Sequence, residues 1–195
     1  LGIGRGDIRE FVAAELDRTL ARLRERSDAQ LLEAPPMSDP VDRARLQLLM
    51  NFSSAWFTAP ELFQIASFRA ARLTAERGLA PGSAVALAYL GIALAMQRDY
   101  EAAYRYGRLA VRIAERIGNP SEECRALLCL GGHVSPWQAS IGESAPLLQR
   151  SYARGLEAGD FEFAAYALTN LVFIRMLSGA PLELVVAEAE RALAF

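Results

Sequence analysis

The chain has 195 residues, of which 52% are hydrophobic, so it can bury one sizeable core and falls outside the disordered class. Its 21 basic and 23 acidic residues are interleaved and leave a formal net charge of −2, which offers no basic surface to a nucleic-acid backbone. All the basic residues are arginine, which excludes a P-loop lysine, a kinase ATP-anchoring lysine and a Schiff-base lysine from this segment.

Apolar residues recur every three or four positions along nearly the whole chain, and the alternation of period two that marks strands is absent. This pattern predicts an all-α protein of about nine antiparallel helices. Glycine and proline breakers divide the chain into the expected helices 6–27, 40–58, 60–77, 83–97, 99–117, 120–138, 142–158, 160–178 and 181–195.

The breakers recur at a regular spacing. Gly78, Gly118 and Gly159 each follow a predicted helix and lie 40 and 41 residues apart, and Asp99 and Asp160 suit a helix N-cap. A unit of about 40 residues with two helices is typical of helical hairpin repeats. We therefore expect one tetratricopeptide-like superhelical domain over 1–195, with an N-terminal helix and linker in 1–39 and four helical hairpins in 40–195.

The segment ALAYLGIALAMQRDYEAAYRYGRLAVRIAERIGN (86–119) carries small and apolar residues at the spacing of the tetratricopeptide pattern. These residues are Leu87, Leu90, Gly91, Ala103 and Ala110. The next unit repeats the pattern, with Gly132 in the place of Gly91 and Gly159 in the place of Gly118. Small residues at these positions let paired helices approach closely.

Four motifs occur together in the order LLEAPPMSDP, RDYEAAYRYGRLAVRIAERIGNP, HVSPWQASIGES and GLEAGDFEFAAYALTNLVFIRMLSGAPLE. In this order and spacing they resemble the helical-repeat region of large multidomain signalling kinases, and the resemblance covers nearly all of 1–195. It implies a parent protein with a serine/threonine kinase domain, an AAA-type ATPase module, this helical region, a GAF sensor and a histidine kinase. It implies no catalytic residue within the region. A smaller transcription-regulating ATPase with a similar helical region is the alternative.

The segment GGHVSPWQ (131–138) contains the single histidine and one of the two tryptophans. Cys129 and His133 are four residues apart and share a helix face, which would supply two ligands of a zinc site. Zinc takes three or four ligands, however, Cys124 lies off this face, and a nucleophilic Cys–His pair would have no orienting third residue. We therefore expect no catalytic residue, no metal and no cofactor here, and the segment is not an enzyme.

Cys124 and Cys129 point to different faces of one predicted helix, so a disulfide between them is not expected. The chain shows no signal peptide and no apolar run of about 18 residues, which favours a reducing, cytoplasmic setting and no membrane contact. It starts with Leu1 and stops in helical register, so we expect a piece of a longer protein.

In a tetratricopeptide-like stack, the first helix of each hairpin lines the concave face. Counting from Gly132 predicts an aromatic and apolar groove, with His133 and Asn170 as its polar contacts, suited to an extended peptide or an amphipathic helix. The candidate binding residues are Phe52, Trp56, Ile92, Met96, His133, Trp137, Asn170 and Ile174. The alternative is that neighbouring helices cover these residues as core. Pro136 would kink or end its helix and move Trp137 off the row.

Four arginines lie one turn apart on the helix predicted over 99–117, which would suit an acidic partner, although intrahelical pairs with Glu101 and Glu115 explain them more simply. They are Arg105, Arg108, Arg112 and Arg116.

The leading hypothesis is a non-catalytic scaffold that couples ATPase or kinase modules to sensor and output domains by binding protein or peptide, including flanking domains of the same chain. The alternative is a regulatory module of an ATPase-type transcription regulator that binds an effector or inhibitory protein in its groove. The sequence leaves the oligomeric state open.

Overall fold

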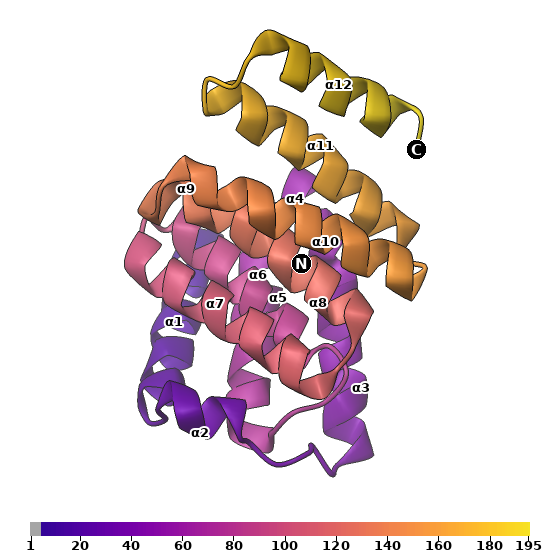
Figure 1. Ribbon diagram of the computed structural model, residues 1–195. Helices are drawn as coiled ribbons and strands as arrows, with labels where there is room; N and C mark the ends of the chain where they lie inside the picture. The colour runs from indigo at the N-terminus through magenta and orange to yellow at the C-terminus, as the bar shows by residue number, and fades with distance from the viewer. Residues whose placement is uncertain (1–4) are drawn as a thin grey trace.

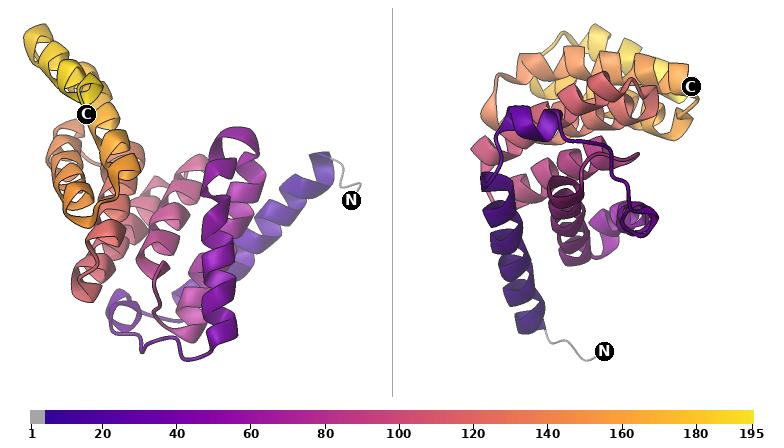
Figure 2. Two further views of the ribbon diagram at one scale, coloured as in Figure 1. Left: turned by 90° about the vertical axis from the view of Figure 1, so that its right-hand side faces the viewer. Right: turned by 90° about the horizontal axis from the view of Figure 1, so that it is seen from below.

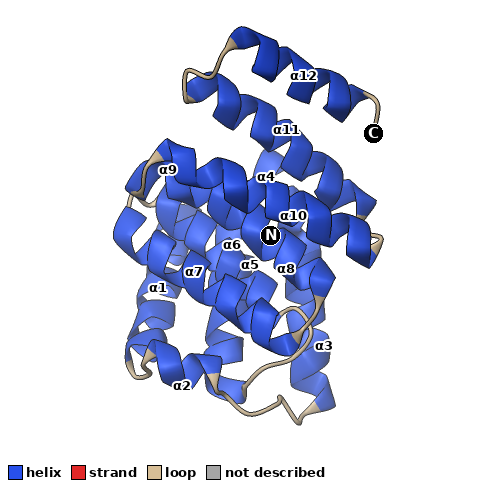
Figure 3. Ribbon diagram, viewed as in Figure 1, coloured by secondary structure: helices blue, strands red, loops and turns tan. Residues whose placement is uncertain are grey.

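The computed structural model describes the backbone of residues 5–195 and, within this range, every side chain except those of residues 5, 6, 53 and 54. The described chain is all-helical (Figure 3). Its extended pairing is limited to one isolated parallel bridge between Pro36 and Leu79. No helix within residues 5–195 combines the length and apolar character that crossing a membrane requires.

The elements follow one another with short connections. They are α1 (Arg5–Arg24), α2 (Asp28–Leu32), α3 (Pro40–Met50), the 3₁₀ turn η1 (Asn51–Ser54), α4 (Ala55–Thr58), α5 (Pro60–Arg77), α6 (Ser83–Met96), α7 (Tyr100–Ile117), α8 (Pro120–Leu128), the π-helical segment η2 (Cys129–Val134), α9 (Ser135–Gln138), the 3₁₀ turn η3 (Ile141–Glu143), α10 (Ser144–Ala158), α11 (Phe161–Leu177) and α12 (Leu182–Leu193).

The predicted number of about nine helices was wrong, because the described chain has twelve α-helical segments. One of them, α2, lies in the expected linker, where Ser27 and Gln30 form a reciprocal capping box. The expected helices 40–58 and 120–138 are interrupted by η1 and η2, respectively. Asparagine and serine at the first break favour turns over helix interiors, and Pro136 explains the second.

Most predicted helix ends coincide with the observed ones. Gly118 and Gly159 end α7 and α10 in the left-handed conformation, with φ of 71° and 69°. Asp99 caps α7 by accepting a hydrogen bond of 3.1 Å from the Ala102 amide. Asp160 occupies the N-cap position of α11, as predicted, but its side chain makes no capping hydrogen bond. Its carboxylate instead accepts hydrogen bonds from Ser121 Oγ at 2.6 Å and Arg125 Nε at 2.9 Å.

Helix α6 lies at the centre of the packing and contacts α3, α5, α7, α8 and η2. Every residue from Ser83 to Leu94 is buried, as expected for a helix that is apolar on all sides. Gly91 allows the close approach of α7, because a Cβ atom at this position would lie 3.0 Å from the Ala103 carbonyl oxygen. The neighbouring helices are thus packed to contact distance.

The remaining helices pack around this centre. Helix α1 packs on α5, α10 packs on α8 and α11, and α12 packs on α11 (Figure 1). The left view of Figure 2 shows α1 on one side of the molecule and α12 on the opposite side.

A buried carboxylate joins α1 to α5. The Glu15 side chain is 2% exposed, and its oxygens accept hydrogen bonds from Arg69 at 3.1 Å and Arg72 at 3.0 Å. Burial by itself raises the pKa of Glu15, but the hydrogen bonds and charges of the two arginines outweigh it and hold the pKa below its ordinary value. The ionised carboxylate therefore stabilises the α1–α5 contact.

We predict that Glu15→Gln lowers the free energy of unfolding at pH 7 by about 1–3 kcal/mol, because two charge-assisted hydrogen bonds are lost. Since the pKa of Glu15 in the folded chain lies below the ordinary value of 4.5, its contribution is present above that pH and is lost as the pH falls through the folded pKa. Urea unfolding of both proteins between pH 3 and 7 measures this loss. The exposed Glu10→Gln on the same helix is the control, and equal stability of the two variants at pH 7 would contradict the prediction.

Candidate binding site

The structure brings four of the eight predicted groove residues together around one cavity. Trp56, Ile92, His133 and Asn170 all line a cavity of about 280 Å³. The remaining lining residues, which the repeat register did not indicate, are Phe57, Phe63, Tyr89, Leu128, Cys129, Glu162, Phe163 and Tyr166. The aromatic residues among them lie in α4, α5, α6 and α11, so the cavity is formed by segments far apart in the sequence.

The other four predicted residues lie outside this cavity. Phe52 and Met96 are 47% and 39% exposed elsewhere on the surface. Trp137 is 64% exposed and stacks on Tyr100, with ring centroids 5.9 Å apart. Ile174 is 3% exposed and belongs to a core cluster between α8, α10 and α11. It is therefore a core residue, and its predicted place in an open groove was wrong.

The π-helical segment explains why His133 and Trp137 separate. Pro136 has no amide hydrogen, and in a regular α-helix its ring would clash with the carbonyl of Gly132. The chain instead widens over Cys129–Val134, where the Ser135 amide donates to the carbonyl of Leu130, five residues earlier. This widening leaves His133 at the cavity and Trp137 outside it. Such π-helical turns are frequent at functional sites.

Two glycines in this segment allow other helices to approach. A Cβ atom on Gly131 would lie 2.9 Å from Leu147 Cβ in α10, and one on Gly132 would lie 2.8 Å from Asn170 Oδ1 in α11. Both separations are shorter than carbon and oxygen atoms tolerate. Gly131 is therefore required by the close packing of α10, and Gly132 leaves room for the Asn170 side chain of α11.

The cavity has aromatic walls on two sides. On one side the Trp56 ring lies 5.2 Å from Phe63 and 4.8 Å from His133, and Phe63 lies 5.6 Å from Tyr89. On the other side, α11 contributes Phe163 and Tyr166. Their centroids are 5.7 Å apart and their planes are nearly perpendicular at 83°. These tilted geometries are those that aromatic pairs prefer.

The histidine and the cysteine of the cavity are poorly suited to proton transfer at neutral pH. Burial lowers the pKa of His133 to about 4 and raises the pKa of Cys129 to about 12, so both are uncharged at pH 7. The Tyr166 hydroxyl donates to Glu162 at 3.1 Å, and this hydrogen bond raises the pKa of Tyr166. Both cysteines are free thiols, and nowhere in residues 5–195 do three His, Cys, Asp or Glu side chains come together as metal ligands.

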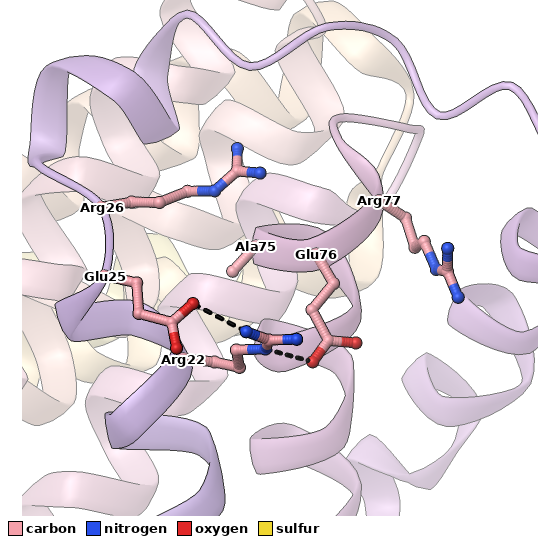
Figure 4. A pocket seen from close by; sticks show the side chains of 6 residues that line it. All are labelled: Arg22, Glu25, Arg26, Ala75, Glu76 and Arg77. Carbon is pink, nitrogen blue, oxygen red and sulfur yellow. Dashed lines mark hydrogen bonds and ion pairs between the residues drawn. The ribbon is translucent and has the colours of Figure 1, made fainter.

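A second pocket, of about 260 Å³, lies between the C-terminal ends of α1 and α5 and is lined mainly by charged residues. Figure 4 shows the Arg22 guanidinium between two carboxylates, 2.7 Å from Glu25 and 3.0 Å from Glu76. These ion pairs join the two helix ends. They account for the composition of this pocket without a ligand.

Two of the arginines of α7 bind polar partners outside their own helix. Arg105 pairs with Asp28 of α2 at 2.6 Å, and Arg116 donates to the carbonyl of Leu32. Glu115, expected to pair within α7, instead pairs with Arg150 of α10 at 2.5 Å. The expectation of intrahelical pairs was therefore wrong for these residues, because α2 and α10 pack against this face.

Comparison with known proteins gives one partial similarity. Over 113 residues the chain is 28% identical to a Dictyostelium discoideum protein named hybrid signal transduction histidine kinase G. The match covers 56% of this chain and 3% of that protein, so the chain spans a small part of the relative's length. No family model and no solved structure matches the chain. The resemblance to signalling kinases is thus confirmed in part, as similarity to a segment of one such protein.

We predict that Gly132→Ala lowers the free energy of unfolding by about 1–2 kcal/mol, because the new Cβ atom displaces the Asn170 side chain. In an Asn170→Ala background most of this cost disappears, since the clashing atoms are gone. Chemical denaturation of the two single variants and the double variant measures the coupling. Gly142→Ala, whose Cβ atom meets only Ser140 Oγ at 3.6 Å, is the control. Additive effects of the two substitutions would contradict the predicted contact.

We predict that His133 titrates with a pKa of about 4 in the folded chain and near its ordinary value of 6.5 when the chain is unfolded in urea. Because the folded pKa is the lower one, His133 favours folding above pH 6.5, and this contribution is lost as the pH falls towards 4. NMR of the imidazole hydrogens measures both values on the single histidine of the chain. A folded-state midpoint near 6.5 would show that the ring is solvated.

Proposed function

We propose that this chain is a non-catalytic, tetratricopeptide-like helical-repeat scaffold of a signal-transduction protein, and that it binds a protein or peptide segment in the cavity between α4, α5, α6 and α11. The binding partner belongs to the kinase, ATPase or sensor modules that flank such regions. The partial similarity to a hybrid signal transduction histidine kinase supports the signalling context.

The observation that carries this proposal is the aromatic lining of the cavity. Trp56 and Tyr166 are partly accessible, and Phe57 is 84% exposed beside them, whereas large aromatic side chains are normally covered. Exposed aromatic clusters mark interaction surfaces, and buried aromatic anchors dominate the affinity of protein interfaces.

The chemistry of the same cavity supports a non-catalytic role. His133 and Cys129 are uncharged at neutral pH and lie among apolar side chains, so neither is poised as a general base or a thiolate nucleophile. Any phosphoryl-transfer step of a parent protein would therefore take place in other modules.

The position of the cavity suggests how binding is transmitted. One wall belongs to α4, α5 and α6, and the other belongs to α11, the second-last helix of the chain. A ligand that contacts both walls favours the arrangement in which they are correctly spaced, and so couples the position of α11 to that of α4, α5 and α6.

A small-molecule effector is the second candidate occupant, because the cavity approaches the size of such sites and is lined mainly by apolar and aromatic residues. At about 280 Å³ the cavity lies just below the size of typical small-ligand sites, roughly 300–1,000 Å³. In this case the chain is the regulatory module of an ATPase-type transcription regulator.

We predict that Trp56 reports on binding and Trp137 does not. In a Trp137→Phe chain, titration with the flanking modules of the parent protein shifts the Trp56 emission saturably, because Trp56 lines the cavity. In a Trp56→Phe chain the same titration leaves the emission of Trp137 unchanged, since this residue stacks on Tyr100 outside the cavity. Fluorescence titration measures both.

A panel of small effectors added to the same two variants separates the candidate occupants. A Trp56 response to the modules alone supports the scaffold, and a response to a small molecule alone supports the regulatory module. If no addition changes the Trp56 emission, the cavity is part of the core, and both the scaffold and the regulatory module are overturned.

A further inference from the structure

We infer that the cavity is a receptor for an arginine side chain of the partner protein, held between the aromatic walls and paired with Glu162. This inference rests on the proposed function and specifies the partner's chemistry. Four features of the described residues carry it: the aromatic faces, the uncompensated carboxylate, the dimensions of the cavity and the way arginine is used elsewhere in the chain.

The aromatic faces provide the first feature. Six aromatic rings line the cavity, from Trp56, Phe57 and Phe63 on one side through Tyr89 to Phe163 and Tyr166 on the other. The face of an aromatic ring is electronegative and attracts a cation within about 6 Å of its centroid, and this attraction grows as water is excluded. Several rings around one cavity are therefore the arrangement that recognises organic cations.

The charge of the lining residues favours the same occupant. Glu162 contributes a carboxylate, none of the lining residues is an arginine, and His133 is neutral at pH 7. Glu162 accepts a hydrogen bond from Tyr166, but it forms no ion pair with any described residue of 5–195. A carboxylate accepts up to about four hydrogen bonds, so acceptor capacity remains for a guanidinium.

The arginine that contacts this aromatic wall is paired with another carboxylate. Arg125 lies over the Phe163 ring, 4.0 Å from its centroid, and its Nε donates to Asp160 at 2.9 Å. Its charge is thereby balanced by Asp160, and it does not line the cavity. Phe163 nevertheless shows that a ring of this wall accepts a guanidinium over its face.

The dimensions fit one long side chain. Water occupies about 30 Å³ per molecule, so a cavity of about 280 Å³ holds roughly nine atoms the size of water, which is too few for a whole helix. Apolar side chains of Ile92 and Leu128 line it together with the rings. Arginine places an apolar stem against such walls while its head remains at the carboxylate.

Arginine rather than lysine is the fitting cation, because its planar guanidinium stacks on rings and binds a carboxylate through two hydrogen bonds. The chain itself uses this contact repeatedly. Arg69, Arg105, Arg108 and Arg191 also lie over aromatic rings, at 5.4, 5.1, 5.8 and 4.6 Å from the ring centroids. The cavity provides such rings without an arginine of its own.

The test uses two capped tripeptides, acetyl-Gly-Arg-Gly-amide and its citrulline analogue, which has nearly the same shape and no charge. Each is titrated at low ionic strength into the Trp137→Phe chain while the Trp56 emission is followed. We expect saturable binding of the arginine peptide with a Kd on the order of 1 mM, and at least about tenfold weaker binding of the citrulline peptide.

A matched pair of variants tests the carboxylate. Glu162→Gln should weaken the arginine peptide about fivefold, as loss of a partly exposed ion pair predicts, and remove most of the preference over citrulline. Glu183→Gln changes another exposed first-turn glutamate, in α12 and outside the cavity, and should leave the affinity unchanged. Circular dichroism confirms that both variants keep the fold.

Equal affinity for the two peptides, or an affinity that Glu162→Gln does not change, would overturn the arginine receptor. If the flanking modules shift the Trp56 emission and the arginine peptide does not, the inference fails and the proposed function stands. If neither shifts it, both fail. Binding of the arginine peptide with the predicted preference, weakened by Glu162→Gln and not by Glu183→Gln, supports the inference.

Discussion

The complete burial of α6 is the constraint on which the rest of the structure depends. This helix has no charged residue and its first twelve residues are all buried, so it is stable only when other elements cover every face. Helices α5, α7 and α8 and the π-helical segment provide this cover. Gly91 in α6 allows the close approach of α7. Gly107 in α7 allows the close approach of the π-helical segment, since a Cβ atom on Gly107 would lie 3.0 Å from Leu130 Cδ1.

Carboxylates at the start of one helix stabilise the connections between successive helix pairs. Glu122, in the first turn of α8, accepts hydrogen bonds from the Gly82 amide at 2.9 Å and the Ala84 amide at 3.2 Å, and so caps α6, whose own N-cap, Gly82, has no side chain. Burial raises the pKa of Glu122 even though these hydrogen bonds lower it. Asp160 makes the corresponding connection from α11 back to Ser121 and Arg125 of α8. The regular spacing of the turns thus corresponds to regular polar contacts between units.

The cavity lies between α11 and the helices α4, α5 and α6. Helix α11 contacts α8, α10 and the π-helical segment, while its first turns also face the aromatic residues of α4 and α5 across the cavity. The π-helical segment contributes His133 and Cys129 to the lining of the cavity. A ligand bound at the proposed site would contact α11 together with α4, α5 and α6 and would favour one relative position of these helices.

The sequence by itself determined the helical class and most helix boundaries, because a period of three to four apolar residues and the terminal glycines and prolines act locally. Counting from Gly132 in the repeat register also selected Trp56, Ile92, His133 and Asn170, which line the cavity, although the same count selected four residues that do not. Only the tertiary structure decided that Phe163, Tyr166 and Glu162 of α11 share a cavity with Trp56 of α4, because that distance depends on how the six intervening helices, α5 to α10, pack. The tertiary structure also decided that Trp137 lies outside the cavity, because the π-helical segment before Pro136 changes the direction of the chain. Ile174 is core because α10 covers the C-terminal part of α11.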